Sequence, residues 1–201
     1  MTELAQDSRG NSFGAGVARL ERASKPKSKA KEALDIKELA LKGIALTNAD
    51  DNLNLGPSKA IISNPNFNID YYKYICCCDG SGSSPRSGIV NGGYGFRINN
   101  EEPQSGAVPG ATNNVAEYTS LIELLKELGN KVEPGDPILI LMDSILVVNQ
   151  VNDSWGTKFK HLADLKSEAQ ALLLDLNAHL IWVPRIIMVK SGVDGAAYDI
   201  R

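Results

Sequence analysis

The stretch YKYICCCDGSG, residues 72–82, decides the fold. Its first residues have the pattern of an apolar β-strand, and the acid Asp79 follows them directly. Neighbouring residues of an extended chain point to opposite faces, so an apolar strand such as Tyr72–Asp79 is expected to be buried on both. A second apolar run, Pro137–Met142, is followed directly by Asp143. If these two strands are neighbours, Asp79 and Asp143 lie at the same edge of one sheet.

Working outward from these strands, the sequence predicts an α/β fold. Gly80–Gly92 is rich in Gly and Ser and predicts a loop, whereas Asn113–Leu128 has apolar residues at helical spacing and ends at a Gly-Asn stop signal. The other expected elements are strands at Gly93–Asn99, Glu102–Pro109 and His179–Val183 and helices at Ile145–Val151 and Lys158–Leu176. The order β-β-β-α-β-α-α-β-α implies a mixed five-stranded sheet, first antiparallel and then parallel, with helices over its faces.

Residues 1–70 differ from the rest and form an expected N-terminal extension before a domain at 71–201. Residues 1–30 are rich in Ser, Gly, Ala and Lys without apolar periodicity, which predicts a disordered start. Ala33–Leu46 has the pattern of a short amphipathic helix, and Thr47–Asp70 predicts a long connector. Residues 19–42 contain eight Lys or Arg and four acids. This excess of positive charge predicts either a weak attraction for nucleic acid or simply a solvated tail. The extension could bind a protein partner, mediate self-association or pack on the sheet.

Composition excludes several classes of protein. The chain is 43% hydrophobic and 22% charged, and no stretch approaches the roughly 18 consecutive apolar residues that cross a membrane. A net charge of −3 provides no basic field for nucleic acid, so a polyanion would be held by local contacts. Residues 1–10 lack the apolar core of a secretory signal, so we expect a cytoplasmic protein. The adjacent Cys76, Cys77 and Cys78 are expected to be buried thiols in a reducing compartment.

Three acids are candidates for chemistry: Asp79, Asp143, and Glu117 about one turn into its predicted helix. Converging carboxylates repel one another, so they either hold protons or bind a hard cation such as Mg²⁺, which prefers oxygen ligands. Each acid also has a plain structural interpretation: Asp79 as a turn residue, Glu117 as a first-turn helix acid, and Asp143 as a helix N-cap. A metal site explains all three together.

Five strings stand between Tyr72 and Asp199, about two thirds of the chain. They are CCCDGSG (76–82), GGYGFRI (92–98), ATNNVAEYTSLIELL (111–125), LILMDSILVVNQ (139–150) and WVPR (182–185). In this order and spacing they resemble the type I ribonuclease H family, above all its short prokaryotic form. The resemblance implies a five-stranded mixed sheet flanked by helices as a catalytic domain at 71–201. It also implies hydrolysis of the RNA strand of RNA/DNA hybrids with two Mg²⁺ ions, or Mn²⁺ instead, leaving 5′-phosphate and 3′-hydroxyl ends.

The resemblance further implies a role for each acid. Asp79 corresponds to the first family carboxylate, which contacts both ions, and Glu117 and Asp143 correspond to the second and third, on the leaving-group side. The fourth follows VPR in the family, in a pattern E-x-N-x-x-A-D whose Glu and Asn are missing here. Asp194, reached after two extra residues, is the preferred fourth carboxylate, and Asp199 competes with it.

Substrate contacts are implied near the first two carboxylates. Asn113 and Asn114 resemble the family's hybrid-contacting pair, and Thr112 with Asn114 resembles its DNA-phosphate pocket; helix N-capping is the alternative. The glycines of DGSG would let RNA approach the backbone, or simply form a turn. Gln150 is either a hybrid contact or a solvent-facing helix residue. The candidate substrate-binding residues are thus Gly80, Ser81, Gly82, Thr112, Asn113, Asn114 and Gln150.

Two other functions compete with a hybrid-cleaving enzyme. The first is an RNA/DNA hybrid-binding protein with weak or no catalysis, because the altered segment Ile186–Asp194 could leave the fourth carboxylate out of reach. The second is a DNA nuclease of the same superfamily. The ATNN string argues against the second, since Asn amides suit contacts with the 2′-hydroxyl groups of RNA.

Overall fold

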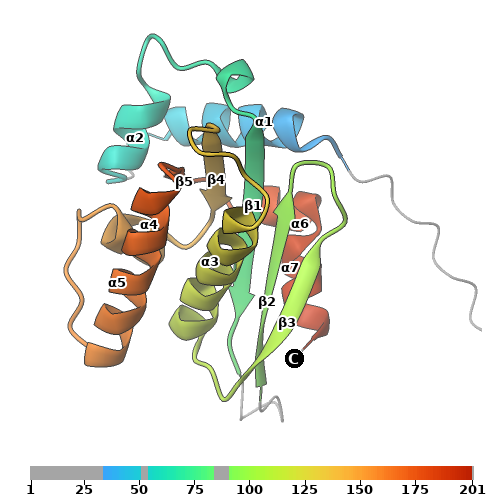
Figure 1. Cartoon of the computed structure of the whole chain (residues 1–201), viewed down its shortest axis with the longest axis vertical. Helices are drawn as coiled ribbons and strands as arrows, with labels where there is room; N and C mark the ends of the chain where they lie inside the picture. The colour runs from blue at the N-terminus through green and yellow to red at the C-terminus, as the bar shows by residue number, and fades with distance from the viewer. Residues whose placement is uncertain (1–33, 51–53, 84–90, 201) are drawn as a thin grey trace, which may run out of the picture. The chain divides into compact units, whose positions relative to one another are not determined.

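The computed structural model describes residues 34–50, 54–83 and 91–200, so the disorder predicted for residues 1–30 lies outside the described residues. Every strand and helix predicted within those ranges is present (Figure 1). The strands are β1 (Tyr74–Ser81), β2 (Asn91–Ile98), β3 (Gln104–Pro109), β4 (Ile138–Met142) and β5 (His179–Trp182). The helices are α1 (Ile36–Asn48), α2 (Pro57–Ile62), α3 (Asn113–Gly129), α4 (Ile145–Val151), α5 (Lys160–Asp175), α6 (Ile186–Ser191) and α7 (Val193–Asp199), with a 3₁₀ turn at Ile69–Tyr71.

The five strands form one mixed sheet in the order β3-β2-β1-β4-β5. β1 pairs antiparallel with β2, and β2 pairs antiparallel with β3. β4 lies parallel to both β1 and β5, because helical crossovers join these strands. The predicted α/β class, and the antiparallel-then-parallel pairing, are therefore confirmed.

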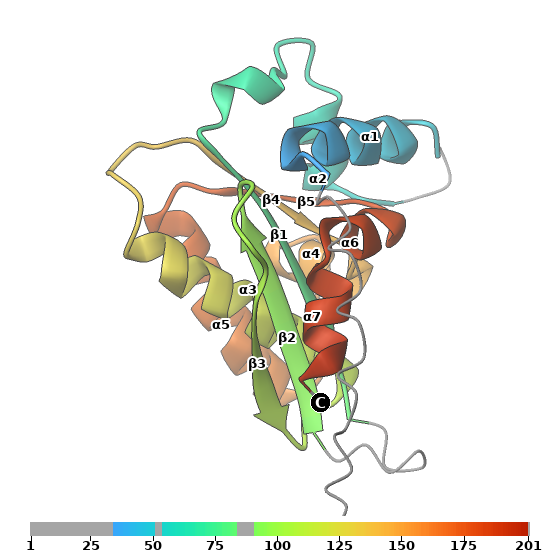
Figure 2. The ribbon, with the colours of Figure 1, turned by 90° about the vertical axis from the view of Figure 1, so that its right-hand side faces the viewer.

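Alternation along the strands divides the core into two layers. Cys76 and Cys78 point to the face covered by α3, α4 and α5, whereas Ile75 and Cys77 point to the face covered by α1, α6 and α7. Figure 2 shows α3 and α5 on one side of the sheet and α6 and α7 on the other. The three cysteines are free and fully buried, as the sequence predicts, so they act as small apolar residues.

The segment before β1 packs on the sheet rather than standing apart from it. Ile36, Leu39 and Ile44 of α1 belong to the same buried cluster as residues of β1, β4 and α6. β5 is an edge strand, and two side chains of this segment form hydrogen bonds with the main chain of Trp182. The Trp182 N–H donates to Ser58 Oγ at 3.2 Å, and the Trp182 carbonyl accepts from Thr47 Oγ1 at 3.4 Å. Covering the edge in this way removes open backbone groups that could pair with another chain.

Three details differ from the sequence-based expectation. The predicted connector Thr47–Asp70 contains the short helix α2 and a 3₁₀ turn. Asp79 is not the last residue of its strand, because β1 continues to Ser81 by pairing with β2 as far as Gly93. The chain after β5 forms two short helices, separated by Gly192 in the left-handed region at φ +87°. Within the described ranges, no helix is both long and apolar enough to cross a membrane.

Candidate active site

Strand register brings Asp79 and Asp143 together. β1 and β4 are parallel neighbours in which Cys77 pairs with Leu141, and each acid lies two residues further along its strand. Asp79 and Asp143 therefore point to the same face of the sheet. With Glu117 they form a cluster in which one carboxylate oxygen from each residue lies within 4.8 Å of the others. The predicted convergence of these three acids is what the tertiary structure shows.

Glu117 reaches this cluster because α3 lies unusually close to β1. A Cβ atom on Gly80 would be 2.2 Å from the main chain of Ala116 and Glu117, so only glycine lets the helix pack there. The Gly80 N–H donates to Glu117 Oε2 at 3.2 Å and fixes the carboxylate beside the strand. Gly82 has the same role one turn earlier, where a Cβ would lie 2.3 Å from the Asn113 nitrogen. Helix packing thus accounts for both glycines of DGSG.

The plain structural interpretations of the three acids do not hold. Asp79 lies inside β1 rather than in a turn. Glu117 is beyond the first turn of α3, which contains no acid, and the N-cap position of α4 is occupied by Ser144 rather than by Asp143. No local structural role therefore explains why these acids are where they are.

The three carboxylates are buried at an electrostatic cost. Their exposed fractions are 1% for Asp79, 4% for Glu117 and 6% for the Asp143 side chain. Burial, followed by the negative charge of Asp143, raises the pKa of Asp79 to about 7. Burial and then the charge of Asp79 raise the pKa of Glu117 well above its ordinary value, and burial also raises the pKa of Asp143. The apo site therefore favours either protons or a cation.

A divalent cation fits the donor set of this site. Among the buried side-chain atoms of the described residues, Oδ1 of Asp79 and Oδ1 of Asp143 have no hydrogen-bond partner. Buried polar atoms are normally satisfied, so each such atom calls for an explanation. Hard carboxylate oxygens are the ligands that Mg²⁺ and Mn²⁺ prefer. The residues thus suit a divalent metal, although they do not select one.

Arg185 supplies the positive charge of the site, a role that the sequence analysis missed. It follows β5 at the edge where β4 ends, and its guanidinium pairs with Asp143 at 3.4 Å and with Asp194. The main chain of Asp143 is also held, since Trp182 Nε1 donates to the Asp143 carbonyl at 2.9 Å. One sequence signal could have found Arg185: it is a charged residue shortly after β5, the strand that neighbours β4.

Asp194, and not Asp199, lies beside the acid cluster. Asp194 pairs with Arg185, which also pairs with Asp143, and the charge of Asp194 adds to burial and to the charge of Asp143 in raising the pKa of Asp79. Asp194 is not among the three acids whose oxygens lie within 4.8 Å of one another. Asp199 is exposed at the last residue of α7, and five residues along a helix turn its side chain to a different face. Asp194 is therefore the better fourth carboxylate on geometry, while its role in catalysis stays a prediction.

The candidate substrate residues around α3 also serve the fold. Thr112 caps α3 by accepting from the Val115 N–H at 3.4 Å, so the capping alternative holds for this residue. Asn113 Oδ1 accepts from the Gly82 N–H at 3.2 Å, which leaves its amide nitrogen as a donor on an exposed residue. Ser81 and Asn114 are half-buried.

Gln150 does not fit one of the two alternatives considered for it, the solvent-facing helix residue. It is buried, its Oε1 accepts from the Tyr118 hydroxyl at 2.9 Å, and its Nε2 donates to the Gly156 carbonyl at 2.8 Å. It is therefore not a solvent-facing residue. A contact with substrate would require these hydrogen bonds to break, so that role stays a prediction.

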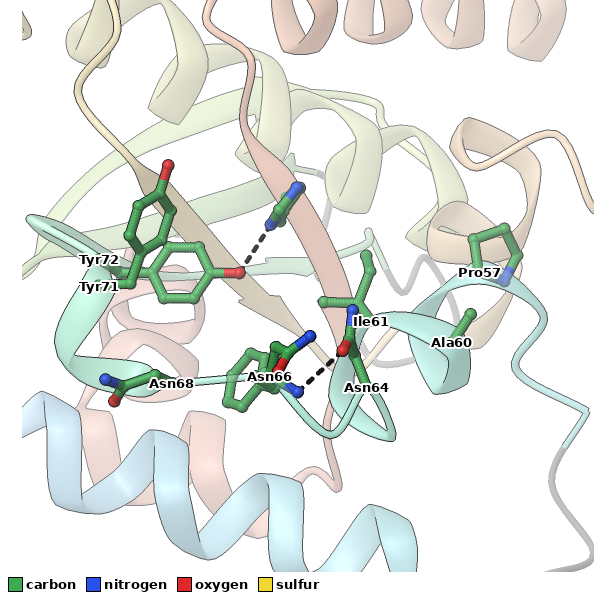
Figure 3. A pocket seen from close by; sticks show the side chains of 10 residues that line it. Pro57, Ala60, Ile61, Asn64, Asn66, Asn68, Tyr71 and Tyr72 are labelled. Carbon is green, nitrogen blue, oxygen red and sulfur yellow. Dashed lines mark hydrogen bonds between the residues drawn. The ribbon is translucent and has the colours of Figure 1, made fainter.

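A pocket of about 460 Å³ lies away from the acids (Figure 3). It is lined by α2, the connector to β1 and His179, including Tyr71, Tyr72 and three asparagines. Tyr72 shares a 2.7 Å hydrogen bond with His179 Nδ1, drawn in Figure 3. His179 is level with Leu139, four residues before Asp143 in the neighbouring strand, so the pocket opens near the other end of the strands. None of the predicted site residues lines it.

Comparisons with known proteins agree with this geometry. No family model matches the chain. The bifunctional protein Rv2228c of Mycobacterium tuberculosis is 42% identical over 81 residues, which are 39% of this chain and 21% of that protein. The chain thus spans about a fifth of the length of the curated relatives it matches. The solved N-terminal RNase H domain of Rv2228c is 31% identical, with a TM-score of 0.54, and the match covers 63% of this chain and 91% of that one.

The chain belongs to the type I ribonuclease H family. Two further structures share the fold of this ribonuclease H. RNase H1 of the halophilic archaeon Halobacterium salinarum is 24% identical with a TM-score of 0.55, and the match covers 63% of this chain and 96% of that one. LC11-RNase H1, solved in complex with an RNA/DNA hybrid, is 23% identical with a TM-score of 0.54, over 63% and 95% of the two chains.

Proposed function

We propose that this chain is a divalent-metal-dependent ribonuclease H that hydrolyses the RNA strand of RNA/DNA hybrids. One observation supports the proposal above all others: three buried carboxylates, from β1, from α3 and from the residue that follows β4, converge to within 4.8 Å. Family membership points to the same chemistry, and one solved relative carries an RNA/DNA hybrid in its structure. We also propose the finer features of the family for this chain, namely two-ion catalysis and products with 5′-phosphate and 3′-hydroxyl ends.

Asp79, Glu117, Asp143 and Asp194 would hold the metal, with Asp79 between the other acids. Bound divalent ions supply an activated water and stabilise negative charge on the phosphate oxygens. The protein's own contribution is positional. The Gly80 N–H fixes Glu117, Trp182 Nε1 fixes the main chain of Asp143, and the pairing of β1 with β2 fixes Asp79. Such fixed ligands lose little freedom when the ion binds.

The substrate would lie along the N-terminus of α3. Thr112 and Asn113 are exposed there, next to Ser81 and the backbone of Gly82. The Nδ2 of Asn113 is a donor that suits a 2′-hydroxyl or a base edge in the minor groove. Arg185 is 64% exposed at the same cluster and can contact a phosphate as well as Asp143 and Asp194.

The test is cleavage of an end-labelled RNA/DNA hybrid with Mg²⁺, beside double-stranded DNA, double-stranded RNA and single strands. Asp79→Asn and Asp194→Asn should each lower kcat by more than about 100-fold, and Asp199→Asn, on an exposed residue of the same helix as Asp194, should stay within about twofold. All three variants should give wild-type circular dichroism. Intact hybrid that is nevertheless bound by the wild-type protein would replace the enzyme by a hybrid-binding protein. Equal cleavage of double-stranded DNA would point to a DNA nuclease.

A further inference from the structure

Arg97 is a buried cation that the proposed chemistry does not use. It is 1% exposed on β2, and its side chain lies on the face of the sheet that α6 and α7 cover. Its strand partner is Cys77, and two residues away Gly95 is the partner of Asp79. At about 3.3 Å per residue, Arg97 lies roughly 7 Å along the strand from the level of the acid cluster.

The guanidinium is bonded to main-chain and amide oxygens rather than to a carboxylate. Nε donates to the Glu101 carbonyl at 3.0 Å, and one terminal nitrogen donates to the carbonyls of Leu34 at 3.2 Å and Ser191 at 3.4 Å. The other terminal nitrogen donates to Asn100 Oδ1 at 3.4 Å. These four oxygens come from three segments that are far apart in sequence. A buried charge is tolerated only when it is hydrogen-bonded in this way.

The contact with Ser191 bears directly on Asp194. Ser191 is the last residue of α6, Gly192 turns the chain, and Asp194 is the second residue of α7. Only two residues therefore separate the bonded carbonyl from the candidate fourth ligand. Carbonyls at a helix C-terminus carry partial negative charge, so a cation is favourably placed there.

α7 packs closely on β2 at two glycines. Cβ atoms on Gly93 and Gly95 would be 2.2 Å from the Ala197 carbonyl oxygen and 2.6 Å from the Val193 carbonyl oxygen. These glycines let α7 approach the sheet but add no side chain of their own to set its position, while Val193 at its start is buried in the core. Hydrogen bonds are directional, and the guanidinium supplies one at the last residue of α6, with only Gly192 between that residue and α7.

We propose that Arg97 is a positioning residue that fixes the start of α7 through the Ser191 carbonyl and so holds Asp194 at the metal cluster. The inference rests on the proposed function only in that Asp194 is taken as a metal ligand. Residues that orient a metal's ligands typically change metal affinity by 10- to 100-fold when they are replaced. We therefore expect a specific loss of metal affinity when Arg97 is changed.

Asn100 offers a matched control in the same network. Its Oδ1 accepts from the Ile36 N–H at 2.9 Å, and its Nδ2 donates to Asp35 at 2.8 Å, so it anchors the start of α1. Asn100→Ala removes that anchor and one bond to Arg97 but leaves the bond from Arg97 to Ser191. It should loosen α1 while metal binding stays near wild type.

The experiment compares full-length wild type with Arg97→Lys, Arg97→Met and Asn100→Ala. Calorimetric titration with Mn²⁺ measures metal affinity without any turnover, and the Mg²⁺ dependence of hybrid cleavage is measured in parallel. We expect the Mn²⁺ Kd and the Mg²⁺ concentration for half-maximal rate to rise about tenfold or more for Arg97→Met. The lysine variant should recover part of the loss, and KM for the hybrid should stay within about twofold of wild type.

Three results would overturn the proposal. The first is wild-type Mn²⁺ affinity in folded Arg97→Lys and Arg97→Met. The second is an equal loss in Asn100→Ala, which would indicate general loosening. The third is a loss of Mn²⁺ affinity in Arg97→Lys that is no greater than the loss in Leu162→Ala. Leu162 lies on α5, on the opposite face of the sheet, and this comparison decides the question if Arg97→Met does not fold. Absence of cleavage by wild type would refute the proposed function alone, because the Mn²⁺ titration still decides the role of Arg97.

Discussion

Replacing Asp79 by Asn should stabilise the metal-free protein at neutral and alkaline pH. Burial and the charge of Asp143 raise the pKa of Asp79 from 3.8 to about 7 in the folded state. Between these two values the folded protein keeps a proton that the unfolded chain has released. Stability therefore falls as the pH rises through this window. Asn has nearly the same shape as Asp and carries no ionisation penalty.

The size of the effect follows from the shift. The pKa rises from 3.8 to about 7, which is about three units, and each unit corresponds to about 1.4 kcal/mol. Ionised Asp79 should thus cost the metal-free fold on the order of 4 kcal/mol above pH 7. Below about pH 4 the carboxyl group is protonated in both states, so the cost disappears. A divalent cation should offset it at high pH, because the ion binds only the ionised folded site.

Urea unfolding at intervals from pH 4 to pH 8 in EDTA measures the free energy of unfolding of both proteins. The Asn variant should be more stable at pH 8, and its advantage should shrink steadily toward pH 4. Asp199→Asn, at an exposed position on α7, serves as the control and should follow wild type throughout. An Asp79→Asn protein no more stable than wild type at pH 8, or an advantage independent of pH, would refute the reasoning. Added Mg²⁺ should stabilise wild type more than the variant.

Three further predictions test the packing and charges around the site. Gly80→Ala should lower the free energy of unfolding in urea by about 3 kcal/mol or more, because its Cβ would meet the main chain of α3. Gly129→Ala, which has open space around it, is the control and should be neutral or stabilising. Arg185→Gln removes the positive charge that pairs with Asp143 and Asp194, so it should lower the thermal midpoint in EDTA at pH 8. The loss should be smaller with Mg²⁺, and an equal loss in both buffers would argue against a shared electrostatic site. Ser58→Ala should cost about 1 kcal/mol by leaving the Trp182 N–H unbonded on the edge of β5, as measured by chemical unfolding beside a distant surface variant.

The sequence by itself determined the elements and the class of fold. Apolar runs such as Ile138–Met142, and the helical spacing over Asn113–Gly129, are local patterns with different periods, so they identify strand and helix without knowledge of their neighbours. The order of those elements then limited the sheet to a mixed topology. Acids that directly follow apolar runs were visible as costly placements, which is why Asp79 and Asp143 could be predicted as partners.

Only the tertiary structure decided what surrounds those acids. Arg185 was not predicted as their counter-charge, and Asp194 was preferred over Asp199 only on a family resemblance, because both depend on how α6 and α7 lie against β2. The glycines of DGSG were predicted to form a turn or to let RNA approach, yet at Gly80 the missing side chain makes room for a helix. Gly95 was predicted only as part of a strand, and there too a helix takes the place of a side chain. Contacts of this kind join residues far apart in sequence, and they depend on interhelical and strand distances that no local pattern encodes.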